Sequence, residues 1–235
     1  MKLWLESLAA SLDMTPSAIV VVSGHWEESQ FSVTGAGNPS LIYDYYGFPP
    51  HTYKLRYDAP GAPALAERIV ELITDAGLPA RIDPARGFDH GVFIPFKVIY
   101  PAADIPIVQL SLRAGLDPRM HVEVGRALQP LRKERVLIVG SGMSYHNLRG
   151  FGPASGAASD EFDDWLTGAV CASDAETRNQ RLEQWQTAPH ARMAHPREEH
   201  LLPLMATAGA AGDDTGQQVL KTHVMGVTVS AYRFG

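Results

Sequence analysis

The amino-acid sequence predicts an α/β protein whose sheet is covered by helices on both faces. Short runs of continuous apolar character occur at residues 18–23, 105–112 and 135–140, and such runs are typical of strands that are buried on both faces. Segments with the apolar spacing of helices separate these runs along the chain. The sequence shows no internal repeat, low-complexity tract or dividing linker, so we expect one domain.

The N-terminal half carries a helix, two strands, a long connection and a second helix. Residues 1–14 have acidic residues inside an apolar pattern, which indicates an amphipathic helix rather than a signal peptide. The strand at 18–23 is followed by a shorter one at 31–34. Residues 35–61 are rich in Pro, Gly and Tyr, and a connection of that length is usually functional or partly structured. Apolar spacing predicts a helix over 63–76.

The C-terminal half continues the alternation. Asp117 and Pro118 predict the start of a helix that runs to about Arg132, with Asp117 as its N-cap. Residues 150–159 are rich in Gly, Ser and Ala and predict a surface or lid loop. The remaining expected elements are helices over 92–100, 160–172, 175–185 and 198–208, and strands over 219–223 and 227–233.

Composition excludes several classes of function. The net charge is −6, from 20 Lys and Arg against 26 Asp and Glu, which excludes a general basic surface for nucleic acid. Cys171 is the only cysteine, so an intrachain disulfide framework is impossible and a cysteine zinc site is disfavoured. The apolar runs are too short to cross a bilayer. We expect no nucleic-acid or membrane partner and, without an export signal, a cytoplasmic location.

Two of the nine histidines follow predicted strands directly. His25 follows the first strand after Gly24, and His146 follows the strand at 135–140 after two glycines. Open α/β sheets bind ligands beyond the carboxyl ends of their strands, where a neutral imidazole suits a metal ligand or a general base. The alternatives are a buried His25 satisfied by the backbone and a turn in which His146 is incidental.

Two further histidines lie at predicted helix starts. His90 follows Asp89 between two glycines, and Asp89 either orients a neighbouring histidine or caps the helix that begins there. In the string HPREEH, Pro196 predicts a first helical turn that contains Glu199 and His200. Adjacent residues of a helix point about 100° apart, so only one of the two can face an ion. The apolar residues that follow favour His200, although acidic residues for the helix dipole are the alternative.

Other chemistries have weaker support. The chain has no phosphate-binding glycine motif with a lysine, no complete dinucleotide fingerprint and no Gly-x-Ser-x-Gly elbow. Cys171 lies in a predicted helix with apolar neighbours, which favours the core over a nucleophile. His121 has charged neighbours and is expected at the surface, and the pair Asp163–Asp164 is expected to be solvated.

Six strings occur in order along the chain: SGHWEE, YDYYGFPPHTYKLRYDAPG, GFDHGVFIPFKVIYP, ADIPIVQLSL, GSGMSYHNLR and HPREEHLLPL. Together they resemble the class III extradiol ring-cleaving dioxygenases, in the branch that includes DOPA 4,5-dioxygenase-like proteins. The resemblance extends from about Pro16 to Phe234. It implies one catalytic domain over residues 1–235 with a mixed central sheet, helices on both faces and a phosphorylase/hydrolase-like architecture.

The resemblance also implies roles for individual residues. His25 and His200 match metal ligands. His146 matches the catalytic acid/base over the open coordination positions and approaches the metal when substrate is absent. His90 matches a residue that lines the substrate pocket, and we count it with His146 among the catalytic residues. From their position in the long connection, we also expect contacts with the substrate's side chain from Tyr46, His51 and Arg56.

The sequence departs from the family pattern at one point. The family begins with a strand that ends in a further metal-ligand histidine, within a His-Gly-Ser-Pro-like string. Only 24 residues precede His25 in this chain, and none is a histidine. Truncation, true loss of the ligand, or replacement by another histidine would each explain this, and we favour truncation because the other site strings are intact.

The implied activity is the opening of a catechol ring with O₂ by a non-haem metal enzyme. Fe(II) is the expected cofactor, and Zn(II) is the alternative that the same histidines would accept. The expected partners are a DOPA-like or otherwise substituted catechol and O₂, with a homodimer as one arrangement of the chain. Two alternative functions are a non-catalytic metal- or partner-binding protein on the same fold, which the missing histidine favours, and a zinc hydrolase.

Overall fold

The chain divides into two compact units, each made of two stretches of sequence. The computed structural model describes residues 1–235. The first unit comprises Met1–Ala114 and Pro130–Ser141, and the second comprises Gly115–Gln129 and Gly142–Gly235. The expectation of a single domain over the whole chain stays a prediction. None of the helices has the length and apolar character that a membrane span requires.

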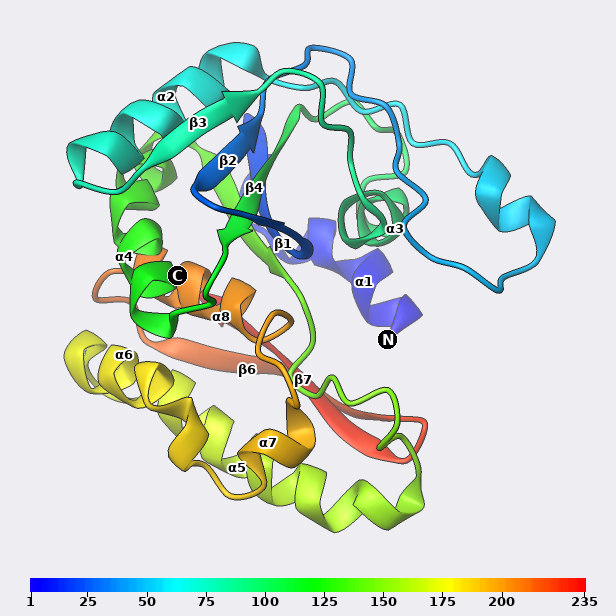
Figure 1. Cartoon of the computed structure of the whole chain (residues 1–235), viewed down its shortest axis with the longest axis vertical. Helices are drawn as coiled ribbons and strands as arrows, with labels where there is room; N and C mark the ends of the chain where they lie inside the picture. The colour runs from blue at the N-terminus through cyan, green and yellow to red at the C-terminus, as the bar shows by residue number, and fades with distance from the viewer. The chain divides into compact units, whose positions relative to one another are not determined.

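A five-stranded mixed sheet forms the centre of the first unit (Figure 1). Its strands are β1 (Ala18–Glu28), β2 (Phe31–Thr34), β3 (Ala80–Asp83), β4 (Ile107–Arg113) and β5 (Val136–Ser141). They lie in the order β3-β2-β4-β1-β5. β1 runs parallel to β4 and β5, β2 runs parallel to β3, and β2 and β4 are antiparallel. The predicted α/β fold with a mixed central sheet is therefore confirmed.

The core of the first unit explains why the sequence of β1 is an unbroken apolar run. Residues Ile19 to Val22 of β1 alternate between the two faces of the sheet, and all four are fully buried. On one face, Ile19 and Val21 belong to an apolar cluster with residues of α3 (His90–Ile99). Helix α2 (Pro63–Asp75) contacts β2 and β3, and α1 (Lys2–Leu8) contacts α3. Both faces of β1 are thus removed from water at these four residues.

Strand β1 is irregular near its carboxyl end. Its regular pairing with β4 ends at Val22, opposite Leu110, and resumes at Glu27, opposite Leu112. The four residues from Ser23 to Trp26 therefore oppose a single residue of β4. A bulge of this kind bends a strand and redirects side chains, and bulges are common beside active sites. The strand thus extends past its predicted end at Ser23, and His25 lies within the bulge.

The second unit consists of helices and one β-hairpin. Its elements are α4 (Pro118–Leu128), α5 (Gly156–Val170), α6 (Ala175–Glu183), α7 (Ala191–Ala194), α8 (Leu202–Ala210), β6 (Gly216–Val224) and β7 (Val227–Phe234). β6 and β7 pair only with each other, in antiparallel register. Helix α5 lies along this hairpin, where it contacts β7 (Figure 1). The two closing strands therefore form a hairpin of their own and do not join the central sheet.

Helices α4 and α8 approach each other through two glycines. A Cβ atom on Gly125 of α4 would lie 2.0 Å from the carbonyl oxygen of Ala206. A Cβ atom on Gly209 of α8 would lie 2.1 Å from the carbonyl oxygen of Val122. Each glycine thus faces the backbone of the opposite helix. Since backbone atoms cannot move aside as a side chain can, this packing requires glycine at both positions.

Most predicted elements match the structure to within a few residues at their ends. β2 has the predicted limits, and Asp117 caps α4 by accepting a 2.9 Å hydrogen bond from the backbone N–H of Arg119. One strand and one α-helix were not predicted. β3 has only half-buried and exposed residues and therefore no apolar run, and α7 has only four residues. The predicted loop at 150–159 is shorter than expected, because α5 begins at Gly156.

Three predicted environments are wrong. His121 is fully buried rather than at the surface, because its Nδ1 lies 2.7 Å from the carbonyl oxygen of Asp117, one helical turn earlier. Asp163 is buried rather than solvated, and its carboxylate lies 3.2 Å from the ammonium group of Lys221. Cys171 is only half-buried, at the C-cap of α5. For His121 and Asp163, a polar partner permits the burial of a group whose neighbours in the sequence predict exposure.

The α4–α8 contact makes a prediction about stability. We expect Gly209→Ala to lower the free energy of unfolding by roughly 1–3 kcal/mol, because the added methyl group overlaps a backbone carbonyl. Gly168→Ala is the matched control. This exposed glycine lies inside α5, where a Cβ would meet only the flexible end of Arg181, at 3.6 Å. It should raise stability by about 0.5–1 kcal/mol through helix propensity. Urea unfolding measures both, and a neutral Gly209→Ala would contradict the close approach.

Candidate functional site

Two clusters in the chain combine imidazoles with a carboxylate. In each cluster, one ligand atom from every residue lies within 4.8 Å of the others. Two histidines and one carboxylate are also the donor set of the facial triad that holds Fe(II) in non-haem oxygenases. The first histidine cluster, in the first unit, consists of His25, Asp44 and His90, and the second histidine cluster, in the second unit, consists of His146, Glu199 and His200.

The first histidine cluster is held together by Asp44. The rings of His25 and His90 lie with their centroids 3.9 Å apart. Oδ1 of Asp44 accepts hydrogen bonds from the backbone N–H and from Nδ1 of His90, both at 2.9 Å. Its Oδ2 lies 3.7 Å from Nδ1 of His25. Burial raises the pKa of Asp44, but the hydrogen bonds and charge of His90 outweigh this and lower it to about 2, so the side chain is ionised at neutral pH.

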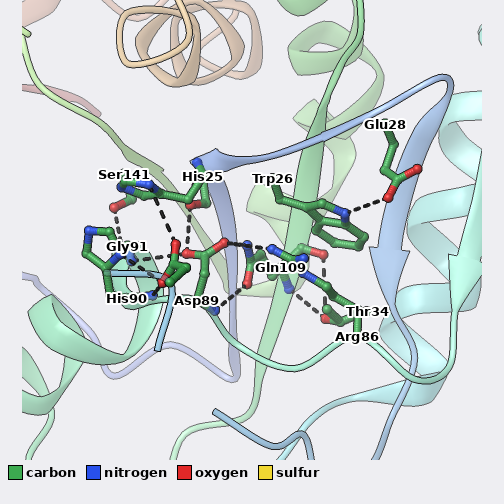
Figure 2. A network of polar contacts seen from close by, with 12 residues as sticks. His25, Trp26, Glu28, Thr34, Arg86, Asp89, His90, Gly91, Gln109 and Ser141 are labelled. Atoms are coloured by element: carbon green, nitrogen blue, oxygen red, sulfur yellow. Dashed lines mark hydrogen bonds and ion pairs between the residues drawn. The ribbon is translucent and has the colours of Figure 1, made fainter. Parts of the chain in front are cut away.

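A buried network centred on Asp89 places both histidines (Figure 2). Asp89 caps α3 by accepting a 3.0 Å hydrogen bond from the N–H of Gly91. The same oxygen accepts a 2.9 Å hydrogen bond from the hydroxyl of Ser23, and that hydroxyl in turn accepts one from the N–H of His25 at 3.2 Å. The cap interpretation of Asp89 is therefore confirmed. The expected alternative, in which Asp89 orients a histidine ring, applies instead to Asp44.

The other Asp89 oxygen is satisfied by two further donors. Gln109 of β4 donates from its side-chain amide, and Arg86 donates from its guanidinium group at 3.4 Å. Arg86 also lies over the ring of Trp26, 4.9 Å from its centroid (Figure 2). A fully buried carboxyl group needs such a complete set of partners. The network therefore joins β1, β4 and the start of α3 around one residue.

Gly91 allows α3 to begin this close to the bulge of β1. A Cβ atom there would lie 2.7 Å from the hydroxyl oxygen of Ser23 and 2.9 Å from Cδ2 of His25. Any side chain at this position would push the start of α3 away from β1. The His25 and His90 rings can therefore lie this close together only because the residue after His90 is a glycine.

The second histidine cluster has a similar composition and closer rings. The centroids of the His146 and His200 rings lie 3.4 Å apart, with 30° between their planes. Nδ1 of His146 lies 3.4 Å from Oε1 of Glu199, and both side chains are 17% exposed. Burial lowers the pKa of His146, and the nearby charge of Glu199 opposes this in part. The neutral imidazole, which is the form that binds a metal, is therefore favoured.

Backbone contacts join the two segments that carry this cluster. The N–H of Met143 donates to the carbonyl oxygen of His200, and the N–H of His146 donates to that of Ala194, each at 3.0 Å. A Cβ atom on Gly142 would lie 2.1 Å from the same carbonyl oxygen of His200. Asn147 donates from its amide to the carbonyl of Met193 at 2.8 Å. The loop after β5 is thus fixed against residues 193–200.

The predicted helical position of Glu199 and His200 is wrong. α8 begins only at Leu202, and residues 196–201 form bends and turns. The 100° separation that holds within a helix does not apply to a turn, so both side chains can approach His146. Oε2 of Glu199 is buried and has no hydrogen-bond donor; its charged neighbour is Arg197, at 3.6 Å. A buried carboxylate oxygen in this state can accept a cation.

A cavity of about 280 Å³ lies beside the second histidine cluster. Its lining residues are His146, Asn147, Leu148, Arg149, Pro196, Arg197 and Glu199. Both arginines are exposed, whereas His146 and Glu199 are half-buried. The cavity thus combines a charged rim with the imidazole that the sequence singled out.

The long connection places the other predicted site residues at the surface. The side chain of Tyr46 is 91% exposed, and His51 is exposed in a short 3-10 helix. Arg56 donates to Asp58 through Nε at 3.2 Å and Nη2 at 3.0 Å. The neighbouring Tyr45 is the tyrosine that contacts His90, edge to face, with centroids 5.6 Å apart. Substrate binding by Tyr46, His51 and Arg56 stays a prediction.

Sequence reasoning missed two residues of the clusters. Asp44 lies between two tyrosines in a connection that was expected to be functional, and its negative charge among aromatic residues was the available signal. Helical geometry would turn Glu199 away from an ion that His200 faces, but residues 196–201 form bends and turns. Only the three-dimensional arrangement shows that each carboxylate adjoins a pair of histidines.

His195 is a buried histidine outside both clusters. Its Nε2 lies 3.0 Å from the carbonyl oxygen of Ser144, and its ring packs against those of Phe162 and Trp185. Burial disfavours its charged form and lowers the pKa of His195 to about 4. A neutral His195 thus helps to hold the backbone just before His146.

An α/β fold that carries imidazole–carboxylate clusters is typical of non-haem metal enzymes. A family model described as the catalytic LigB subunit of aromatic ring-opening dioxygenase matches residues 2–235. The chain belongs to this family. The resemblance to class III extradiol dioxygenases is confirmed, and with it the prediction of an extradiol ring-opening dioxygenase, an oxidoreductase.

Individual relatives agree with the family. The chain is 41% identical over 240 residues to the protein named dioxygenase tasH of Hapsidospora irregularis, covering 95% of this chain and 73% of that protein. It is 38% identical over 238 residues to 4,5-DOPA dioxygenase extradiol of Beta vulgaris, covering 98% and 86% of the two proteins. A crystal structure of an uncharacterized protein from Escherichia coli K12 is 31% identical, with a TM-score of 0.83 over 100% of this chain and 92% of that one.

The burial of His195 makes a prediction about pH. Its ordinary pKa of 6.5 applies when the chain is unfolded, so between about pH 6.5 and pH 4 the unfolded state binds a proton that the folded state does not. The contribution of His195 to the free energy of unfolding is therefore fully present above pH 6.5. It falls by up to roughly 3 kcal/mol as the pH drops to 4. His195→Gln keeps a donor for Ser144 but cannot titrate. In urea unfolding at pH 7 and pH 4.5, it should lose less stability than the wild type, and equal losses would refute the assignment.

Proposed function

We propose that this protein opens the ring of a catechol beside its diol with O₂, using ferrous iron as cofactor. One observation carries the proposal: every histidine that the family resemblance implicates, at positions 25, 90, 146 and 200, belongs to one of the two histidine clusters. The same resemblance supports His25 and His200 as metal ligands and His146 as the acid/base group. DOPA-like catechols are the first substrates to test, because the Beta vulgaris relative is named for DOPA.

The donor chemistry of the residues fits a divalent metal. Imidazole nitrogens and carboxylate oxygens suit Fe(II), and they suit Zn(II) equally well. The buried Oε2 of Glu199 has no hydrogen-bond donor to replace. His146 is itself a candidate ligand when substrate is absent, since its ring adjoins that of His200. When bound, iron supplies the one-electron chemistry through which O₂ reacts with a closed-shell aromatic ring.

The residues of the second histidine cluster supply the proton transfer. His146 takes the proton of a catechol hydroxyl and later returns one as the ring opens. The carboxylate of Glu199, 3.4 Å from Nδ1 of His146, stabilises the imidazolium that forms in between. The bond cut lies beside the diol, both atoms of O₂ enter the product, and the product is a ring-opened semialdehyde. His90 lines the substrate pocket, with Tyr46, His51 and Arg56 as candidates for the substrate's side chain.

Metal content and turnover of single variants test these roles. The anaerobic protein is loaded with Fe(II), mixed with DOPA or caffeate and O₂, and followed by O₂ consumption and by the yellow ring-opened product. We expect His25→Ala and His200→Ala to retain less iron than the wild type. His146→Ala, when fully loaded with iron, should lower kcat by about 10²–10⁴-fold, the usual contribution of a general acid/base.

His223→Ala is the matched control for these variants. His223 lies on β6 outside both clusters, and its side chain is 65% exposed, so this variant should behave as the wild type. Full activity of His146→Ala would contradict its role. A wild-type protein that binds zinc tightly and consumes no O₂ with any catechol would instead support a non-catalytic metal-binding protein. The expected homodimer and cytoplasmic location stay predictions.

A further inference from the structure

Asp44 has no role in the proposed reaction, although its Oδ1 lies within hydrogen-bond distance of two nitrogens of His90. We propose that Asp44 is a positioning residue that fixes His90 in the tautomer with its proton on Nδ1. Nε2 of His90 then carries a lone pair and accepts a hydrogen bond from a catechol hydroxyl. This inference rests on the proposed function, in which His90 lines the substrate pocket.

The tautomer follows from the hydrogen bonds. Oδ1 of Asp44 lies 2.9 Å from Nδ1 of His90 and 2.9 Å from the backbone nitrogen of the same residue. A carboxylate is only an acceptor, so both nitrogens must donate. A neutral imidazole has one N–H, and once that N–H is on Nδ1 the other nitrogen is an acceptor. The opposite tautomer would place two lone pairs 2.9 Å apart at Asp44 and an N–H at Nε2.

The backbone on either side holds Asp44 in place. The N–H of Ile42 donates to the carbonyl of Phe88, and the N–H of Phe88 donates to the carbonyl of Ser40, both at 2.8 Å. These hydrogen bonds pair the segment at 40–42 with Phe88. Asp44 and His90 lie two residues further along the two paired segments. Gly87 permits the approach, because a Cβ atom there would lie 2.2 Å from the carbonyl oxygen of Ser40. Asp44 is therefore fixed to the same segment that carries His90.

Tyrosines confine the same loop and the His90 ring. The hydroxyl of Tyr43 donates to the carbonyl of Leu55 at 2.6 Å, and that of Tyr45 donates to the carbonyl of Thr52 at 2.7 Å. The ring of Tyr45 meets that of His90 edge to face, at an interplanar angle of 85°. With His25 against another part of the ring, His90 has little freedom to rotate. A fixed ring with a fixed tautomer is a preorganised hydrogen-bond acceptor.

A metal ion bound by the first histidine cluster alone is the competing explanation. The geometry favours positioning, because Oδ1 of Asp44 already accepts two N–H donors from His90 and a cation bound at that oxygen would have to displace them. Oδ2 lies 3.7 Å from Nδ1 of His25, which is beyond hydrogen-bond distance, so Asp44 acts chiefly on His90. The two explanations predict different metal contents for an Asp44 variant.

Nitrogen NMR of the histidine rings measures the tautomer without any reference to activity. The full chain is labelled with ¹⁵N and loaded with Zn(II), which is diamagnetic, and two-bond ¹H–¹⁵N correlations separate protonated from bare ring nitrogens. His90 is assigned from the signals that disappear in His90→Gln. We expect a protonated Nδ1 and a bare Nε2 in the wild type. A protonated Nε2 in the wild type would overturn the proposal even if no variant folds.

Three variants distinguish the loss of the acceptor oxygen of Asp44 from the loss of its negative charge and from the removal of an unrelated carboxylate. Asp44→Ala removes the acceptor and should give mixed or reversed His90 tautomers, with kcat/KM at least about 10-fold lower. Asp44→Asn keeps an acceptor oxygen and should retain the tautomer and most of the activity. Asp75→Ala is the control that removes a carboxylate elsewhere in the first unit, because Asp75 is exposed at the end of α2 and belongs to neither histidine cluster, and it should change neither measurement.

The outcomes distinguish the inference from the function on which it rests. An unchanged tautomer in Asp44→Ala would refute positioning, and so would stoichiometric loss of metal from that variant, which would make Asp44 a ligand. The expected tautomers in a protein that opens no catechol would support the role of Asp44 toward His90 and contradict the proposed function. A lower kcat/KM for Asp44→Ala with restoration in Asp44→Asn would support both.

Discussion

The buried carboxyl group of Asp89 is the contact on which the geometry of the first unit depends. It receives hydrogen bonds from the bulge of β1, from the first turn of α3 and from β4, so three elements meet at one side chain. Hydrogen bonds to such a group contribute about 1.5–3 kcal/mol each, and an unsatisfied one costs more. The bulge at Ser23–Trp26 and the start of α3 are thereby held together, and with them His25 and His90. The positions of the two histidines thus depend on a residue that is not itself a member of the cluster.

The two histidine clusters are built by the same means. In each, a glycine lets the backbone approach so closely that no side chain would fit, Gly91 against His25 in the first cluster and Gly142 against the carbonyl of His200 in the second. In each, the histidines come from distant parts of the sequence and a carboxylate joins them. Two imidazoles at centroid distances of 3.9 and 3.4 Å repel each other when both are charged. The second cluster therefore favours a neutral His146, whose pKa burial also lowers, and this is the state that metal binding and proton acceptance both require.

The sequence predicted the parts of this structure that depend on local pattern. Continuous apolar runs located β1 and β4, which are buried on both faces, and β5, which is half-buried at the edge of the sheet. Asp117 located the start of α4 because capping is a local interaction. The residue strings also located His25, His90, His146 and His200. Local pattern could not reveal the burial of His121, whose partner is a carbonyl of its own helix, or the turn that precedes α8. The sequence did not single out Asp44 and Glu199, because each matters through a contact with a distant residue. Asp44 contacts a histidine 46 residues away in the chain, and Glu199 contacts one 53 residues away.

The difference between the two carboxylates separates the roles of the two clusters. Oδ1 of Asp44 is occupied by two N–H groups of His90, so its charge is used to orient an imidazole. Oε2 of Glu199 is buried without a hydrogen-bond donor, and its charged neighbour is Arg197 at 3.6 Å, so this oxygen can still accept a cation while Oε1 faces His146. A hydrogen-bonded carboxylate resists displacement, whereas an unsatisfied one gains free energy when a cation arrives. The proposed roles, in which Asp44 orients His90 and Glu199 faces a cation or a protonated His146, therefore require no hydrogen bond of this structure to break.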